Sequence, residues 1–391
     1  MRLFVNGTGA SAGGGLTYLR NLLPHLAEQE DLQCVVALNA GTKDNLPTFP
    51  KISFCEPARS KNAFIRFAEE QIVLPRMLRQ SRSDVLLSIG NFALRNCPVP
   101  QILLSRNALY TSADFYQDVR QRNEFRLLAD SRIKASLAKR SILEADLTIA
   151  PTDAFARELQ LWTGKPVFAL HHGFDPNEFF RDQSALPAYI EARLAEPGDA
   201  VRLLHVSHYN YYRNFETLFR ALALLKARLK GKPVKLFLTC RLSPRQNPGA
   251  YKTERAAQLI RHLGIEEDVI QLAHIPYSRL HQLYRACDIY VSAAYAESFA
   301  HPLVEAMACG LPLAISDIAV HREVSTGSAL YFGRFAPEEL AAAVHGITNS
   351  QSLAKSLSQQ GLRRARDFSW KQHVERILEL ATSAAQSHRT N

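Results

Sequence analysis

Short apolar runs of strand length alternate with longer stretches of helical pattern along most of the 391-residue chain, and no other sequence feature limits the possible folds as much. A strand followed by an amphipathic helix and a further strand is typical of parallel βαβ units. The alternation therefore predicts an α/β protein with parallel sheets. In the first half we expect helices at 16–29 and 62–80, and strands at 2–6, 34–39, 84–90, 101–105, 146–152 and 166–173.

The same pattern starts again after a charged, proline-containing stretch at 176–200. Strands are expected at 201–208, 234–239, 269–275, 289–294 and 311–316, with helices between them. The pattern predicts two doubly wound, Rossmann-like domains facing each other across a cleft. The expected boundaries are 1–175 for an acceptor-side domain, 176–200 for a connector and 201–365 for a second domain that binds the ligand. Ligands of such sheets lie outside the carboxyl ends of the strands.

The overall composition is that of a globular protein, with 47% apolar and 21% charged residues, which excludes disordered and fibrous classes. A net charge of +10 favours an anionic partner: nucleic acid, anionic lipid or a phosphorylated small molecule. No apolar run is long enough to span a membrane, and glycines interrupt the N-terminal segment where a signal peptide needs its apolar core. Six cysteines without a Cys-x-x-Cys motif indicate reduced thiols, so we expect a cytoplasmic protein.

Positive charge is concentrated at 51–82 and 120–140. Either these residues form solvated helix faces, or they make a surface for anionic lipid or glycan. The segments 62–80 and 119–140 are expected to be helical, and four phenylalanines in or near them would either face the core or touch a bilayer surface. Those phenylalanines are Phe64, Phe67, Phe115 and Phe125.

The most informative segment is Glu297 to Gly310, ESFAHPLVEAMACG, which follows an expected strand and opens a helix. Pro302 suits the first helical turn, and Gly310 suits the end of the helix. Residues 298–301 then present free backbone N–H groups at the positive end of the helix, which is an anion site. A diphosphate is a common metabolite that such a site binds.

Two carboxylates flank this anion site, Glu297 before the loop and Glu305 inside the helix. Negative charge beside a phosphate is unfavourable unless each carboxylate accepts hydrogen bonds from neutral donors, and vicinal sugar hydroxyls are such donors. Side chains on a helix lean toward its N-terminus, so Glu305 can reach back to a ligand. Compensation of the helix dipole is the alternative role for Glu305 alone.

The spacing of Glu297 and Glu305 within 297–324 resembles the signature of retaining nucleotide-sugar glycosyltransferases of family 4, which have the GT-B fold. The resemblance extends over most of the chain. It implies that 366–391 form a terminal helix that crosses back onto the first domain. Further segments similar to this family are 9–26, 206–222, 263–294 and 367–378.

The resemblance implies donor-site roles for individual residues. Glu297 would bind hydroxyls of the transferred sugar and Glu305 the ribose diol. Arg213 stands where the family has a lysine that neutralises the diphosphate, and it adds a bidentate fork. His208 replaces an arginine of the family, so either its protonated form or Arg241 would have to supply the second positive charge.

Other residues are expected around the same ligand. The remaining donor-side candidates are Gly13, Gly14, Gly15, Asn214, His274, Ser298, Phe299, Ala300 and His301. His274 lies in the turn that should pass the nucleobase. Where the first domain of the family has a histidine near the sugar, this chain has Arg106 and Asn107, which together with His172 are candidates for the acceptor or sugar side.

The sequence thus predicts a retaining hexosyltransferase that moves a sugar from a nucleoside diphosphate sugar to a glycan or lipid-linked acceptor, in polysaccharide or lipopolysaccharide synthesis. We expect no metal cofactor, no nucleic-acid partner, and a cytoplasmic location at the inner face of an anionic membrane. Three alternatives stay open: a nucleotide-sugar epimerase of the same fold, a nucleic-acid binder suggested by charge, and a basic binding protein without catalysis.

Overall fold

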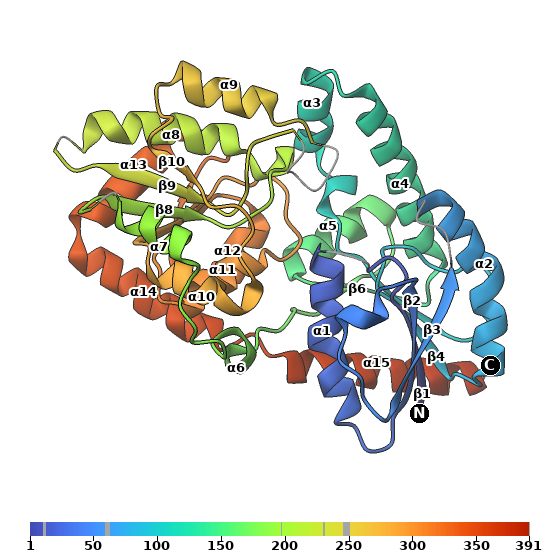
Figure 1. Cartoon of the computed structure of the whole chain (residues 1–391). Coiled ribbons are helices and arrows are strands. Elements are labelled where there is room, and N and C mark those ends of the chain that lie inside the picture. Colours follow the sequence, from blue (N-terminus) through green and yellow to red (C-terminus); the bar gives the residue numbers. More distant parts are fainter. Residues whose placement is uncertain (11–12, 59–62, 197, 230, 245–250, 391) are drawn as a thin grey trace. The chain divides into compact units, whose positions relative to one another are not determined.

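The computed structural model describes residues 1–10, 13–58, 63–196, 198–229, 231–244 and 251–390. The chain forms two compact units. The first unit consists of Met1–Thr111, Ala129–Gly173 and Ser369–Asn391, and the second of Ser112–Leu128 and Phe174–Phe368. Each unit contains one parallel β-sheet with helices packed on it (Figure 1).

The first unit is built on a seven-stranded sheet of order β3-β2-β1-β4-β5-β6-β7. Because side chains alternate along a strand, β1 supplies both faces of this sheet. Leu3 and Val5 join the core beneath α1 and α15, and Phe4 joins the core beneath α2. The strands are β1 (Arg2–Asn6), β2 (Gln33–Asn39), β3 (Ile52–Ala58), β4 (Val85–Ser88), β5 (Gln101–Leu104), β6 (Leu147–Ala150) and β7 (Phe168–Ala169).

Helices cover both faces of this sheet, as the doubly wound pattern predicts. The C-terminal helix α15 packs against α1 and contributes Trp370, Val374, Ile377 and Ala381 to the same core. The helices of this unit are α1 (Gly13–Ala27), α2 (Ala63–Gln80), α4 (Phe125–Glu144, whose first four residues group with the second unit), α5 (Asp153–Thr163) and α15 (Trp370–Thr390), with 3-10 turns η1 (Lys43–Asn45) and η2 (Ala108–Tyr110).

A glycine fixes the start of α15. A Cβ atom on Gly173 would lie 2.1 Å from the backbone nitrogen of Trp370, a distance that no side chain tolerates. We therefore expect Gly173→Ala to lower the free energy of unfolding by about 1 to 3 kcal/mol, because the helix must move away from the sheet. Chemical denaturation would measure the loss. Gly14→Ala is the matched control, since its Cβ would have nothing within 4 Å.

The second unit is built on a six-stranded parallel sheet of order β10-β9-β8-β11-β12-β13. Most residues of its strands are buried, and its helices pack in pairs, with α8 on α13 and α11 on α14. The strands are β8 (Val201–His205), β9 (Val234–Leu238), β10 (Val269–Gln271), β11 (Ile289–Ser292), β12 (Leu313–Ser316) and β13 (Ala329–Phe332).

The remaining helices complete the second unit. They are α3 (Ala113–Gln121), α6 (Pro176–Phe179), α7 (Ala188–Ala195), η3 (Tyr211–Arg213), α8 (Phe215–Arg228), α9 (Glu254–His262), α10 (Tyr277–Arg285), α11 (His301–Ala308), α12 (Ala319–Ser325), α13 (Pro337–Asn349) and α14 (Gln351–Ala365). None of the helices in the described part of the chain is both long enough and apolar enough to cross a lipid bilayer.

The structure differs from the sequence predictions at several places. Residues 112–128, expected within the first domain, group with the second unit, and 176–200 contains α6 and α7. The single helix expected at 119–140 is two helices, because the chain turns at Asn123 with φ 58°. The glycine turn before residue 16 is instead the first turn of α1, and strands β3 and β13 were not expected.

Candidate active site

The candidate site lies where the strand order of the second sheet reverses. Strands β8 and β11 are neighbours in the sheet. From β8 the chain continues to β9 on one side of this pair, and from β11 it continues to β12 on the other side. Ligands of doubly wound sheets bind in the crevice outside the carboxyl ends of two such strands. The loop after β8 carries Arg213, at the end of η3, and the loop after β11 carries Glu297.

The two residues predicted to be catalytic are paired with each other. An ion pair joins the Arg213 guanidinium to the Glu297 carboxylate, and their side chains are only 18% and 8% exposed. The guanidinium also lies 5.1 Å from the centre of the Tyr212 ring. A sugar diphosphate would offer each partner a replacement, hydroxyl donors for Glu297 and phosphate oxygens for Arg213. The structure therefore brings the expected cation and carboxylate together at the crevice.

The start of α11 forms the third part of the site. Ala300 takes a left-handed conformation, with φ 68°, just before the helix begins at His301. Phe299 is buried, with its ring 5.4 Å from that of Phe368, which fixes the loop. The first turn has no acidic residue, so the positive end of the helix dipole is not neutralised locally. Residues 298–301 thus lie at a helix end suited to an anion.

Glu305 lies inside α11 and is almost fully buried, at 6% exposure. The Tyr284 hydroxyl of α10 donates a 2.8 Å hydrogen bond to its carboxylate. Burial raises the pKa of Glu305 to about 7, and the bond from Tyr284 opposes this rise. Tyr284 was not found from sequence, because nothing in its own segment marks it as a partner of a carboxylate 21 residues away. The ribose role of Glu305 stays a prediction.

Two buried histidines near Arg213 were also missed. His205 and His321 each direct Nδ1 at a backbone carbonyl, of Val291 at 2.8 Å and of Ser316 at 3.0 Å. Burial lowers the pKa of each to about 4, and the positive charge of Arg213 contributes to the lowering. Both rings are therefore neutral at pH 7, and Arg213 meets no competing cation from them.

His208 and His274 follow β8 and β10, and their rings are parallel to within 10° at a centroid distance of 6.5 Å. Burial lowers the pKa of His208, and the neighbouring His274 and Arg213 lower it further. A protonated His208 is thus disfavoured before ligand binds. Of the two options for a second positive charge, this favours Arg241, an exposed residue after β9.

Asn214 holds the turn between η3 and α8. Its backbone is left-handed, with φ 52°, and its amide donates a 2.6 Å hydrogen bond to the Arg334 carbonyl. Its Oδ1 accepts a 3.0 Å bond from the Thr217 hydroxyl. These contacts position the turn that carries Arg213, and a direct contact of Asn214 with the donor stays a prediction.

In the first unit, Arg106 lies beside the glycines that open α1. Its guanidinium donates a 3.0 Å hydrogen bond to the Gly14 carbonyl and lies 5.5 Å from the centre of the Tyr18 ring. A Cβ on Gly15 would lie 2.9 Å from the Ala10 backbone and 2.9 Å from this guanidinium, and the backbone contact requires glycine at this position. Burial lowers the pKa of Arg106. Arg106 and the Gly13–Gly15 turn thus form one cluster at the carboxyl ends of the strands.

The other first-unit candidates have contacts within the fold. Asn107 accepts a 3.1 Å hydrogen bond from the Leu109 backbone and caps η2. His172 is 4% exposed and stacks on Trp370 at 5.8 Å, with Tyr18 at 5.1 Å. Roles of Asn107 and His172 toward an acceptor stay predictions.

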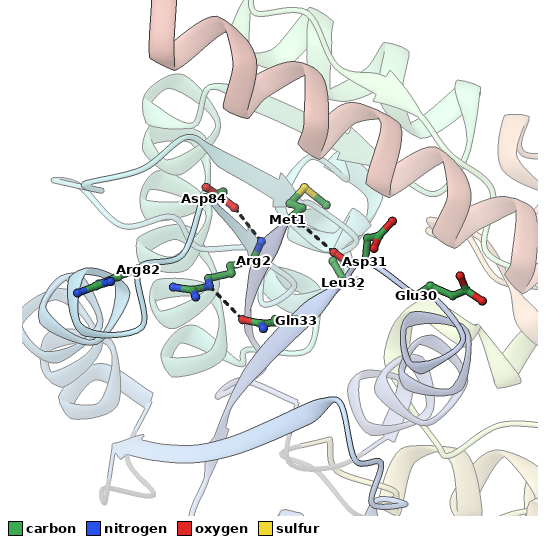
Figure 2. A pocket seen from close by; sticks show the side chains of 8 residues that line it. All are labelled: Met1, Arg2, Glu30, Asp31, Leu32, Gln33, Arg82 and Asp84. Carbon is green, nitrogen blue, oxygen red and sulfur yellow. Dashed lines mark hydrogen bonds between the residues drawn. The ribbon is translucent and has the colours of Figure 1, made fainter.

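A hollow of about 480 Å³ lies at the amino ends of strands β1 and β2, opposite the carboxyl ends of the first sheet (Figure 2). Its charged and polar groups bond within the fold: the Arg2 backbone N–H donates to Asp84 at 2.8 Å, and the Arg2 side chain donates to Gln33 at 3.0 Å. Because ligands of such sheets bind at the carboxyl ends, we do not assign this hollow to the substrate.

Similar solved structures identify the fold. Sucrose-phosphate synthase from Thermosynechococcus elongatus aligns with a TM-score of 0.79 and 17% identity, over 99% of this chain and 100% of that chain. Anabaena HepE in complex with UDP-glucose aligns with a TM-score of 0.72 and 17% identity, over 98% and 100%. The fold is the GT-B fold, made of two Rossmann-like domains with parallel sheets.

Comparison with the sequences of known proteins narrows the class of protein that the chain resembles. Residues 189–364 match the family described as Glycosyl transferases group 1, and this range includes Arg213, Glu297 and Glu305. A D-inositol 3-phosphate glycosyltransferase from Thermobispora bispora is 29% identical over 252 residues, which cover 63% of this chain and 58% of that protein. The chain thus spans less than two thirds of the length of this relative. Together the comparisons support a glycosyltransferase.

Proposed function

We propose that the chain is a retaining glycosyltransferase that moves a sugar from a nucleoside diphosphate sugar to an acceptor hydroxyl. The observation that carries the proposal is the Arg213–Glu297 ion pair, at the crevice between β8 and β11 and within the family-matched range. The crystallised complex of Anabaena HepE with UDP-glucose supports this donor class.

The reaction breaks the bond between the anomeric carbon and the diphosphate oxygen, and it forms a bond from that carbon to the acceptor oxygen. The acceptor proton passes to the leaving diphosphate, and the acceptor attacks from the same face, so the configuration is retained. Arg213 and the amide end of α11 stabilise the negative charge that grows on the diphosphate. Glu297 orients the sugar through its hydroxyls. Arg241 adds a second cation, and these charges serve in place of a metal.

Two classes of acceptor are consistent with the residues of the chain. The basic helices of the first half favour a glycan or lipid-linked acceptor, as in polysaccharide or lipopolysaccharide synthesis. The name of the Thermobispora relative favours a phosphorylated polyol instead. The half-buried cation of Arg106 beside Gly14 suits a phosphate in either class.

A panel of nucleotide sugars tested by thermal shift would check the donor, because a bound ligand raises the melting temperature. UDP-glucose, GDP-mannose and ADP-glucose are suitable members. We expect one member to stabilise the protein and then to release its nucleoside diphosphate faster when acceptor is added. Conversion of the donor without acceptor would indicate an epimerase. The absence of any shift with every member would indicate a binding protein without this activity.

We also propose that the enzyme works at the inner face of an anionic membrane, through the basic faces of α2 and α4. Ile72 on α2 and Ile133 on α4, both in the first unit, are 61% and 52% exposed. Phe125, which groups with the second unit, is 61% exposed. Of the two alternatives for Phe115, the structure supports the core, because its side chain is fully buried. Phe67 is half-buried, with its ring 5.7 Å from that of Phe92, and the side chain of Phe64 is outside the described part of the structure.

Sedimentation with vesicles tests the membrane contact. We expect the protein to sediment with vesicles that contain phosphatidylglycerol and to stay in solution with phosphatidylcholine alone, because Lys and Arg attract anionic lipid. The paired change Ile72→Ser and Ile133→Ser should weaken sedimentation severalfold. Tyr189→Ser is the matched control, since Tyr189 is 53% exposed on α7. Equal sedimentation with both lipids would contradict the contact.

A further inference from the structure

The segment 112–128, which we call the arm, groups with the second unit, although the chain before and after it belongs to the first. It contains α3 and the first turn of α4. The Ser112 hydroxyl caps α3 by accepting a 3.2 Å hydrogen bond from the Phe115 backbone. The arm is therefore an ordered part of the second unit.

Arg122 is the centre of the contacts that hold the arm. Its guanidinium donates to Asp118 at 2.7 Å, forms an ion pair with Glu216 at 2.9 Å, and lies 4.2 Å from the centre of the Tyr211 ring. The side chains of Arg122 and Glu216 are only 10% and 7% exposed. The Tyr209 hydroxyl donates to the same Glu216 oxygen at 3.1 Å. The largely buried Arg122 thus joins the end of α3 to η3 and to the start of α8.

The same network reaches the loop that carries Glu297. The Tyr295 hydroxyl donates to Asp118 at 2.9 Å, and the Tyr295 backbone N–H donates to the Tyr212 carbonyl at 3.0 Å. Tyr295 is two residues before Glu297, and Tyr212 directly precedes Arg213. The arm therefore contacts both loops of the candidate site beside the residues that form its ion pair.

A third contact closes the network. Arg334, after β13, forms a two-point ion pair with Asp114 of α3, at 2.6 and 3.3 Å. The Arg334 carbonyl accepts the hydrogen bond from Asn214, the residue that follows Arg213. The arm thus reaches the turn of Arg213 from two sides, through Arg122 and through Arg334.

We propose that Arg122 is a positioning residue, which keeps the loops of Arg213 and Glu297 in register through Asp118, Glu216 and Tyr211. This inference rests on the proposed function. Arg122 has no contact with donor in this scheme, and it acts only on the placement of the two groups that face the sugar diphosphate. Its loss should therefore affect the chemical step more than the binding of the nucleotide, which the scheme assigns to Glu305.

The test compares variants of the full chain in steady-state assays with UDP-glucose, or with the nucleotide sugar that replaces it in the panel. We expect Arg122→Met to lower kcat about 10- to 100-fold and to change KM for the donor less than about threefold, as for a small misplacement of reacting groups. Arg122→Lys keeps the charge and should restore part of kcat. Arg120→Met, which changes an exposed arm residue on α3, is the matched control and should match wild type.

A second variant keeps the test decisive if Arg122→Met does not fold. Tyr295→Phe removes only the hydroxyl that bonds to Asp118, and the ring can keep its contact with Phe335 at 5.5 Å. It should lower kcat severalfold with an unchanged melting temperature. An inactive wild type would contradict the proposed function. An active wild type with unchanged kcat in Tyr295→Phe and Arg122→Lys, or with kcat and donor affinity falling together, would overturn the positioning role.

Discussion

Arg213→Ala is expected to lower turnover by about 100- to 1000-fold, the effect of removing one preorganised group that stabilises transition-state charge. Arg213 is the residue of the crevice that can meet the diphosphate with a bidentate fork, and the neighbouring His205 and His321 are neutral. KM for the donor should change less than kcat, because charge grows on the diphosphate only as the bond breaks. Steady-state kinetics with the donor found in the panel would measure both constants.

The controls for this variant separate catalysis from stability. Arg220→Ala removes an exposed arginine of α8 and should leave turnover unchanged. Arg213→Ala leaves the buried Glu297 carboxylate without its cation, which can itself destabilise the fold. The double change Arg213→Ala with Glu297→Gln removes that unpaired charge, so it should recover the melting temperature but not the turnover. Wild-type turnover in Arg213→Ala would remove Arg213 from the site.

The sequence predicts the sheets well because their signal is local. Strand β1 alternates between two buried faces, and most other strands of both sheets are short apolar runs bounded by polar turns. Strand β3 was missed because it contains Glu56 and Pro57, which are unusual in a strand but tolerated at a sheet edge. The grouping of the arm could not be predicted, since it depends on Arg122 meeting Glu216 almost a hundred residues further along.

The residues of the site that lie within one short segment could be predicted from local pattern. The contacts between residues far apart in the sequence could not. Glu297, Glu305 and the start of α11 occur within a few residues, so their proximity follows from helix geometry. The ion pair of Arg213 with Glu297 joins two loops. The family resemblance assigned each of the two residues to the donor, but their pairing was not predicted. Tyr284 and the neutral state of His205 depend on burial, which no local pattern reveals.

Glu305→Ala is expected to weaken the binding of a nucleoside diphosphate by about 1 to 3 kcal/mol, the range for buried hydrogen-bonding groups that lose a partner. The ribose hydroxyls would lose their acceptor, and the Tyr284 hydroxyl would lose its own. Calorimetry with UDP and GDP would measure the change. Glu338→Ala removes an exposed carboxylate of α13 and is the matched control. Unchanged affinity in Glu305→Ala would dismiss the ribose role.

The pH dependence of binding gives an independent test of the same carboxylate. Because burial raises the pKa of Glu305 to about 7, a substantial part of the molecules carries a protonated Glu305 at neutral pH, and that form accepts hydroxyl donors less well because one of its oxygens is itself a donor. Nucleotide affinity should therefore rise between pH 6 and pH 8 in the wild type and stay flat in Glu305→Gln.

The free energy of unfolding should change with pH in the opposite direction, because a Glu305 pKa above its ordinary value of 4.5 means that the folded state holds the proton more tightly than the unfolded state. The stabilising contribution is complete below pH 4.5 and is lost as the pH rises through 7. Glu305→Gln should consequently be more stable than wild type at pH 8 without nucleotide, and bound nucleotide should reduce that difference, because its hydroxyls stabilise the charged carboxylate that the empty site disfavours.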